Sequence, residues 1–140
     1  MTNKWSREEL ERAHDNFKET AARCAASGEW REWADLFTED ARLVLGDQVT
    51  EGREAIRDLM ATLQPDGRRG LHLTANPIVD IDGVGATAVS DYLFLRPTAA
   101  GPVPVAAGHY HDELVRHDDR WRFRRRAITI LTAPEAGPGA

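Results

Sequence analysis

The sequence predicts an α+β domain in which three N-terminal helices cover one face of a curved, antiparallel or mixed sheet. Two observations predict this class. Apolar residues recur at helical spacing in the first half of the chain, and from Gly70 onward they alternate with polar residues at the period of a strand. A length of 140 residues is typical of one domain with its own core. We expect a single domain over residues 1–131 and a disordered, Pro/Gly-rich tail over residues 132–140.

The first predicted helix begins at a capping-box pattern, Ser6 followed by Glu9, and ends at Ser27-Gly28. Cys24 falls on its apolar stripe, so we expect a buried side chain rather than a nucleophile. As the single cysteine, Cys24 excludes an internal disulfide and fits a reducing cytoplasm, which is the expected location.

The second and third helices are shorter and flank a strand over residues 41–46. The second carries aromatic residues on one side, namely Trp30, Trp33 and Phe37. The third spans residues 52–63, and its apolar residues recur at helical spacing: Ile56, Leu59, Met60 and Leu63. A Pro-Asp-Gly break at residues 65–67 ends this helix.

Four strands follow, predicted over residues 71–81, 86–95, 103–116 and 121–131. The turn signal Asp82-Gly83 joins the first two, and residues 117–120 join the last two.

Charge and hydropathy exclude two classes of partner. A formal net charge of −5 argues against a general nucleic-acid binder, whose affinity rests on a cationic surface. No segment has the long apolar run that a membrane span needs. We therefore expect neither nucleic acid nor a membrane as a partner.

The last hairpin divides its side chains between two faces. If it turns at residues 117–120, Asp112 lies opposite Arg125 and shares a face with Tyr110. An ion pair between Asp112 and Arg125 is then structural, or Arg125 and Tyr110 donate hydrogen bonds to a developing enolate or carbonyl oxygen. The opposite face is mostly charged and holds His109, His111, Glu113, Val115, Arg122, Arg124 and Arg126.

That charged face is expected to be solvated or to contact a second subunit, which makes a homodimer through the sheet face the expected assembly. His109, His111 and Glu113 share it at a spacing known among metal ligands. The facing arginines would repel a cation, so we expect no metal there.

His72 gains a carboxylate neighbour if Asp82-Gly83 forms a two-residue turn. His72 then pairs with Leu93, and Asp91 becomes its diagonal neighbour on the same face. A carboxylate would raise the basicity of the imidazole and give a general base near neutral pH. The alternative is that His72 and Asp91 face water, because the opposite face of this hairpin is the more apolar one.

Four ordered stretches resemble the SnoaL-like branch of the nuclear transport factor 2-like superfamily: AASGEWREWADLFTEDARLVL, EGREAIRDLM, HLTANPIVDIDGVGATA and GHYHDELVRHDDRWRF. The resemblance covers about residues 8–130. It implies a cone-shaped, strongly bent sheet around three helices, with an apolar pocket at the open end and frequent dimerisation. Relatives include scytalone dehydratase, ketosteroid isomerase, limonene epoxide hydrolase and polyketide cyclases, which work without a cofactor, and also members that catalyse nothing.

The family's usual acids and bases are replaced in this chain. The catalytic Tyr-Asp pair of scytalone dehydratase corresponds to Ala25-Ala26, and its pocket tyrosine corresponds to Leu45. The base of ketosteroid isomerase also falls at Leu45, and its helical tyrosine falls near Ala21.

What remains is His72, which matches the dehydratase's strand histidine, and Tyr110 on the long strand. The resemblance and the predicted faces together assign His72, Asp91 and Tyr110 as catalytic. The expected substrate-binding residues are Trp33, Leu45, Tyr92, Asp112 and Arg125.

Two functions are compatible with these residues. The first is a cofactor-independent enzyme that cyclises, isomerises or dehydrates a small polyketide-, steroid- or terpenoid-like molecule, with His72 as base and Tyr110 as hydrogen-bond donor. The second is a non-catalytic small-molecule-binding or assembly protein of the same fold. The missing acids favour the second, and the surviving His72 and Tyr110 favour the first, which we prefer.

Overall fold

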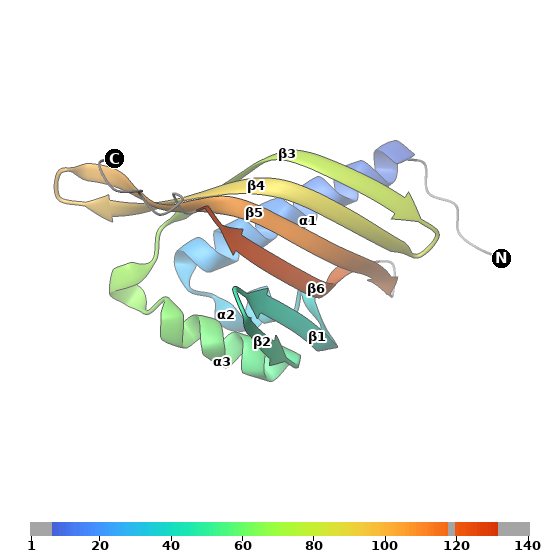
Figure 1. Ribbon diagram of the computed structural model, residues 1–140, viewed down its shortest axis with the longest axis horizontal. Helices are drawn as coiled ribbons and strands as arrows, with labels where there is room; N and C mark the ends of the chain where they lie inside the picture. The colour runs from blue at the N-terminus through green and yellow to red at the C-terminus, as the bar shows by residue number, and fades with distance from the viewer. Residues whose placement is uncertain (1–6, 118–119, 132–140) are drawn as a thin grey trace, which may run out of the picture.

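The computed structural model describes residues 7–117 and 120–131, and these residues form the predicted α+β fold (Figure 1). The predicted tail over residues 132–140 lies outside the described residues. The helices are α1 Arg7–Ser27, α2 Trp30–Ala34 and α3 Arg53–Leu63, followed by a short 3-10 turn, Asp66–Arg68. The strands are β1 Phe37–Leu45, β2 Gln48–Glu51, β3 Leu71–Asp82, β4 Gly85–Thr98, β5 Gly101–His117 and β6 Arg120–Ile130.

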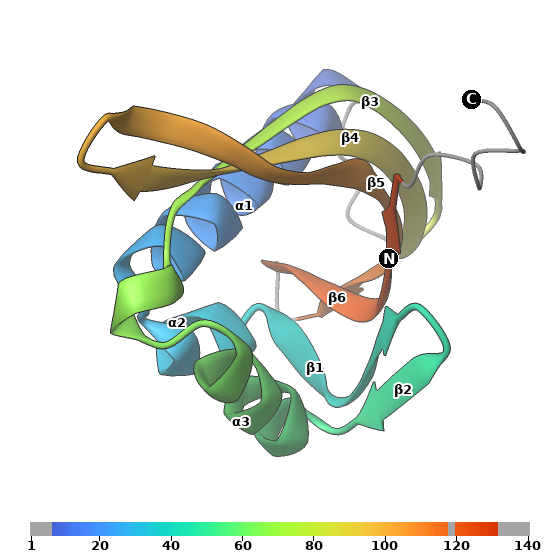
Figure 2. The same ribbon diagram turned by 60° about the vertical axis from the view of Figure 1, so that its left-hand side comes forward.

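The strands form one mixed sheet in the order β2-β1-β6-β5-β4-β3. Neighbouring strands are antiparallel except β1 and β6, which are parallel. Figure 2 shows β3 to β6 bending round a common axis, with the helices on the concave side. This is the open cone expected for the fold. The sequence analysis missed β2, whose four residues are largely exposed and therefore show no alternation.

Two of the bulges in the sheet change which side chains of the β3–β4 and β5–β6 pairs reach the inside of the cone. In β3 the pairing with β4 shifts between Ala75 and Ile78, where Asn76 adopts a positive φ of 54° and Pro77 follows. The pairing of β5 with β6 shifts between Glu113 and Leu114. Because each extra residue exchanges the two faces of a strand, a register counted from the turns alone fails beyond these points.

The core lies between α2, α3 and the β1–β6 end of the sheet. Its largest fully buried side chains are Phe37, Phe123, Leu43 and Ile56. Aromatic rings continue from α2 into the sheet, with centroid distances of 5.5 Å for Trp30–Trp33, 4.7 Å for Trp33–Phe37 and 4.9 Å for Phe37–Phe123. Phe37 was expected on the second helix, but it is the first residue of β1. Cys24 is buried in this core, as predicted.

Candidate functional site

A cavity of about 200 Å³ lies between the helices and the concave face of the sheet, which we call the inner face. The helical wall is apolar and consists of Ala21, Ala22, Ala25, Trp33, Met60 and Leu63, with Gln64 at the end of α3. The sheet wall consists of Leu45, His72, Thr74, Tyr92, Phe94, Ala106, Tyr110, Arg126, Ile128 and Ile130. Leu63 and Ile130 are partly exposed and form the rim of the cavity's mouth.

Arg126 is the one cation of this wall in the part of the chain that the structure describes. Its Nε lies 2.8 Å from Oδ1 of Asp112, and its Nη2 lies 3.0 Å from Oδ2. The guanidinium carbon lies 4.0 Å from the ring centroid of Tyr110 and 4.1 Å from that of Phe123. A bidentate ion pair between two aromatic faces holds the charge in one position. Nη1 is the guanidinium nitrogen that Asp112 does not engage.

The electrostatics of this pair follow from burial. Arg126 and Asp112 are only 6% and 4% exposed. Burial by itself would lower the pKa of Arg126, but the charge of Asp112 and its hydrogen bonds raise it, so the guanidinium remains charged. Since the carboxylate is fully occupied by Arg126, Asp112 is not a free acid or base for a ligand.

The prediction that Arg125 faces the cavity opposite Asp112 is wrong. Arg125 pairs with Glu113 in the register and lies on the convex face, which we call the outer face, whereas Arg126 takes the inner position. The cause is the extra residue near Arg124, which shifts the register by one beyond Leu114 and Phe123. Three consecutive arginines give no sequence signal for the position of this bulge.

Tyr110 and Tyr92 form a stacked pair beside Arg126, with ring centroids 4.5 Å apart. Burial raises the pKa of Tyr110 to about 12, and it also raises the pKa of Tyr92. Both phenols are therefore protonated at neutral pH.

Gly108 pairs with Tyr92 across the strands, and a β-carbon at Gly108 would overlap the carbonyl oxygen of Thr129 and lie 2.9 Å from the Tyr92 ring. The glycine thus leaves room for the Tyr92 ring.

His72 lines the cavity from β3, and its ring stacks on Phe94 at a centroid distance of 4.5 Å. Its Nδ1 is buried and has no hydrogen-bond partner among the described residues, which leaves Nε2 as the ring nitrogen available to a ligand. Burial, together with the charge of Arg126, lowers the pKa of His72 to about 4. His72 is therefore a neutral imidazole near pH 7, and the expected general base with a near-neutral pKa is not what this environment produces.

The predicted partnership of His72 with Asp91 is also wrong. His72 pairs with Phe94 rather than Leu93, and Asp91 lies on the outer face. There Asp91 accepts a hydrogen bond from Asn76 at 2.9 Å and lies 2.8 Å from Nδ1 of His109, two contacts that lower its pKa. The two-residue turn is formed by Gly83-Val84, one position later than expected. The later turn and the bulge in β3 together bring His72 opposite Phe94. The Asn-Pro pair inside β3 is a sequence signal for that bulge.

The remaining predicted residues lie as follows. Trp33, Leu45 and Tyr92 are part of the cavity wall, and Asp112 lies behind Arg126. Ala21 and Ala25 also line the cavity. The sequence analysis missed Gln64, whose Oε1 is buried without a hydrogen-bond partner in the described part of the chain. Nothing in its position, directly before Pro65, could have indicated this.

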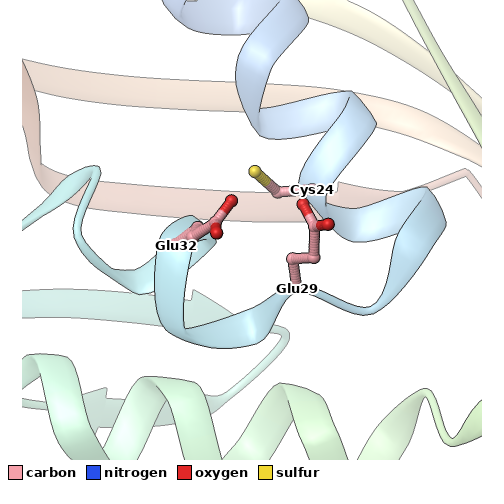
Figure 3. A group of neighbouring side chains, drawn as sticks. All are labelled: Cys24, Glu29 and Glu32. Atoms are coloured by element: carbon pink, nitrogen blue, oxygen red, sulfur yellow. The ribbon is translucent and has the colours of Figure 1, made fainter.

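The metal alternative at His109, His111 and Glu113 does not assemble, because in the described part of the chain the ligand atoms of these three side chains do not converge on one position. Within residues 7–117 and 120–131, three potential ligand atoms do converge at Cys24, Glu29 and Glu32 (Figure 3). Burial and the two nearby carboxylates raise the pKa of Cys24. The protonated thiol is a poor ligand, so this cluster does not make a convincing metal site.

None of the helices described is both long and apolar enough to cross a membrane.

Comparisons with solved structures find the same fold in several bacterial proteins. Rv3472 of Mycobacterium tuberculosis, whose function is unknown, is 27% identical, with 86% of this chain and 71% of that chain covered and a TM-score of 0.79. A candidate scytalone dehydratase of Novosphingobium aromaticivorans is 21% identical, with 94% and 90% covered and a TM-score of 0.78. ActVI-ORFA of Streptomyces coelicolor is 22% identical, with 86% and 96% covered and a TM-score of 0.79.

A comparison with curated proteins finds no match. The model of the SnoaL-like domain matches residues 7–127, which is most of the chain. The cone of helices and mixed sheet described above agrees with that match. The chain therefore belongs to the SnoaL-like domain family.

Proposed function

We propose that the chain is a cofactor-independent enzyme that acts on a small hydrophobic molecule and stabilises negative charge developing on one of its oxygen atoms. In the proposed reaction a proton beside a carbonyl group of the substrate passes to a water molecule at the cavity mouth, and the electrons of the broken C–H bond move negative charge onto the carbonyl oxygen. Cyclisation, isomerisation or dehydration of a polyketide-, steroid- or terpenoid-like compound then follows from this enolate. The observation that carries the proposal is the buried Arg126 guanidinium, fixed at the wall of an apolar cavity with Nη1 left for a ligand.

The neighbouring side chains fit this role. Tyr110 is a protonated phenol beside Arg126 and is proposed as the second hydrogen-bond donor. His72 is proposed to contact the ligand through Nε2 as a neutral group. An unpaired buried acceptor is less costly than an unpaired buried donor, so the proton is expected on Nε2 rather than on the sealed Nδ1. The similarity to a candidate scytalone dehydratase supports a reaction of this class.

The proposal is tested first with a phenol whose absorbance reports its ionisation, such as 4-nitrophenol. Donors and a cation in the wall should lower the pKa of the bound phenol by about 1 unit or more, whereas an apolar cavity without them would raise it. Tyr110→Phe should reduce this shift, and His111→Ala, on the outer face, should leave it unchanged. A bound phenol with a raised pKa would remove the proposed charge stabilisation.

Native mass spectrometry of the purified protein, followed by turnover of whatever molecule it carries, tests catalysis itself. Tyr110→Phe should lower kcat by about 10-fold to 100-fold, because one donor to the developing charge is lost. Identical turnover by the wild type and Tyr110→Phe would show that Tyr110 has no such role.

A non-catalytic binding or assembly protein is the second candidate. It is favoured by one observation: among the described residues, no carboxylate of the cavity wall is free to accept a proton, and the pKa of His72 is about 4. A ligand that binds in the cavity and is released unchanged would favour this reading.

We also propose a homodimer through the outer face of the sheet. Ile78 and Val89 pair across β3 and β4 on that face and are 73% and 37% exposed, and neighbouring exposed apolar side chains of this kind are common at protein–protein contacts. Light scattering over a range of protein concentrations tests this assembly.

A further inference from the structure

A second hollow, of about 750 Å³, lies on the other side of His72. It is an open groove between the C-terminal half of α1 and the first residues of β3, and we call it the α1–β3 groove. It shares three lining residues with the inner cavity, namely Ala22, His72 and Thr74. These three residues, which we call the neck, line both hollows, so a ligand that reaches past them would occupy the inner cavity and the groove together.

The groove differs from the cavity in its chemistry. Its helical side carries the exposed side chains of Glu19, Arg23 and Glu29, whereas the cavity wall is mostly aromatic and aliphatic. Its other side is β3, the last strand of the sheet, and no strand pairs with the free edge of β3 in the described part of the chain. Backbone N–H and C=O groups at such an edge can bond to amides or hydroxyls of a ligand.

We propose that the α1–β3 groove binds the uncharged, amide-bearing tail of a ligand whose ring system occupies the inner cavity. This inference rests on the proposed function, and it narrows the substrate class to elongated molecules with an apolar head and a polar chain. A tail with a free carboxylate fits less well, because two of the three charged side chains of the groove are acidic.

Two probes separate the tail from the head. The first is 6-hydroxy-2-naphthamide, and the second is the same ring carrying a β-alanine amide on its amide nitrogen. Titration by fluorescence should show that the tailed probe binds the wild type about tenfold more tightly than the head alone. A third probe of equal length, ending in a carboxylate, should gain clearly less.

Ala26→Leu is the main variant, because Ala26 lines the groove and not the inner cavity. It should remove most of the tenfold gain while the affinity for the head stays as in the wild type. Ala22→Leu, at the neck, should remove the gain whatever it does to the head. Ala61→Leu is the matched control, an exposed alanine of α3 away from both hollows, and it should keep the full gain.

The outcomes distinguish failure of the groove proposal from failure of the proposed function. Equal affinity of both probes for the wild type, or an unchanged gain in folded Ala26→Leu and Ala22→Leu, would show that the groove does not bind the tail, without affecting the proposed role of the cavity. If no probe binds at all, the proposed cavity function fails and the groove fails with it. Thermal melting of each variant shows that a lost gain does not come from unfolding.

Discussion

The two faces of the β5–β6 hairpin hold arginine and carboxylate groups in adjacent positions but in opposite environments. On the inner face Arg126 and Asp112 meet at 2.8 Å, with side chains 7% and 2% exposed. On the outer face Glu113 lies 3.5 Å from Arg124 and 4.0 Å from Arg125, and these side chains are 41–62% exposed. The residue types are the same, so the difference between the two clusters is burial and geometry.

This comparison shows which of the two clusters can have a function beyond solubility. Outside, water screens the charges and the side chains keep much of their freedom. Inside, the desolvated guanidinium is fixed by a bidentate carboxylate and two rings, and its charge adds to burial in lowering the pKa of His72. A fixed charge that is felt by a second group in the same cavity is what a binding or catalytic site requires.

The largest expected effect comes from breaking the inner pair. Arg126→Met leaves the Asp112 carboxylate buried without its partner, which should destabilise the protein by about 3–5 kcal/mol. The double variant Asp112→Leu/Arg126→Met removes both charges and should recover most of that loss. Urea unfolding of the three proteins at pH 7 measures the difference.

The double variant also tests whether the charge of Arg126 stabilises a bound anion. It should remain folded yet lower the pKa of a bound phenol much less than the wild type does, since the charge is gone while the cavity and Tyr110 remain. A double variant as unstable as Arg126→Met would mean that packing at these positions, not the unpaired charge, dominates.

The next effect is the pH dependence that His72 contributes to stability. Its pKa is about 4 in the folded chain, against a usual value of 6.5. Between these values the unfolded chain binds more protons than the folded one, so stability is complete above about pH 6.5 and is lost as the pH falls toward 4. From about pH 7.5 to pH 5 the loss should be on the order of 2 kcal/mol.

His72→Gln has no proton to take up in this range, so its unfolding free energy should fall less than that of the wild type between the same two pH values. His111→Gln, on the exposed outer face, is the matched control and should follow the wild type. Parallel curves for the wild type and His72→Gln would show that the imidazole is solvated in the folded protein.

Most of the fold could be predicted because each half of the chain carries its own periodicity. The apolar spacing of residues 52–63 predicted α3 to within one residue, and the alternation after Gly70 predicted the four long strands. The parallel pairing of β1 with β6 joins residues far apart in the chain, and local patterns carry no information about it. The sequence analysis therefore did not predict this pairing.

The site was predicted less well, because its composition depends on two single-residue bulges. Counting from the turns placed Asp91 beside His72 and Arg125 beside Asp112, and each bulge moved the true partner by one position. Trp33, which is on a helix, and Leu45, whose place came from the resemblance, were predicted to line the cavity, and they do. Their roles in binding remain predictions.

The smallest change in unfolding free energy is expected for a substitution on the outer face. The same substitution tests whether that face contacts a second copy of the chain. Glu113→Gln removes the carboxylate that Arg124 and Arg125 share, and in a solvated cluster it should change the unfolding free energy by about 0–1 kcal/mol, less at high salt. Urea unfolding at two salt and two protein concentrations measures this.

If two copies pair through the outer face, burial would strengthen these interactions. The cost of Glu113→Gln would then rise with protein concentration, because association stabilises the folded chain by mass action. A small cost that does not depend on concentration would place this end of the sheet in water and restrict any dimer contact to the apolar side chains around Ile78 and Val89.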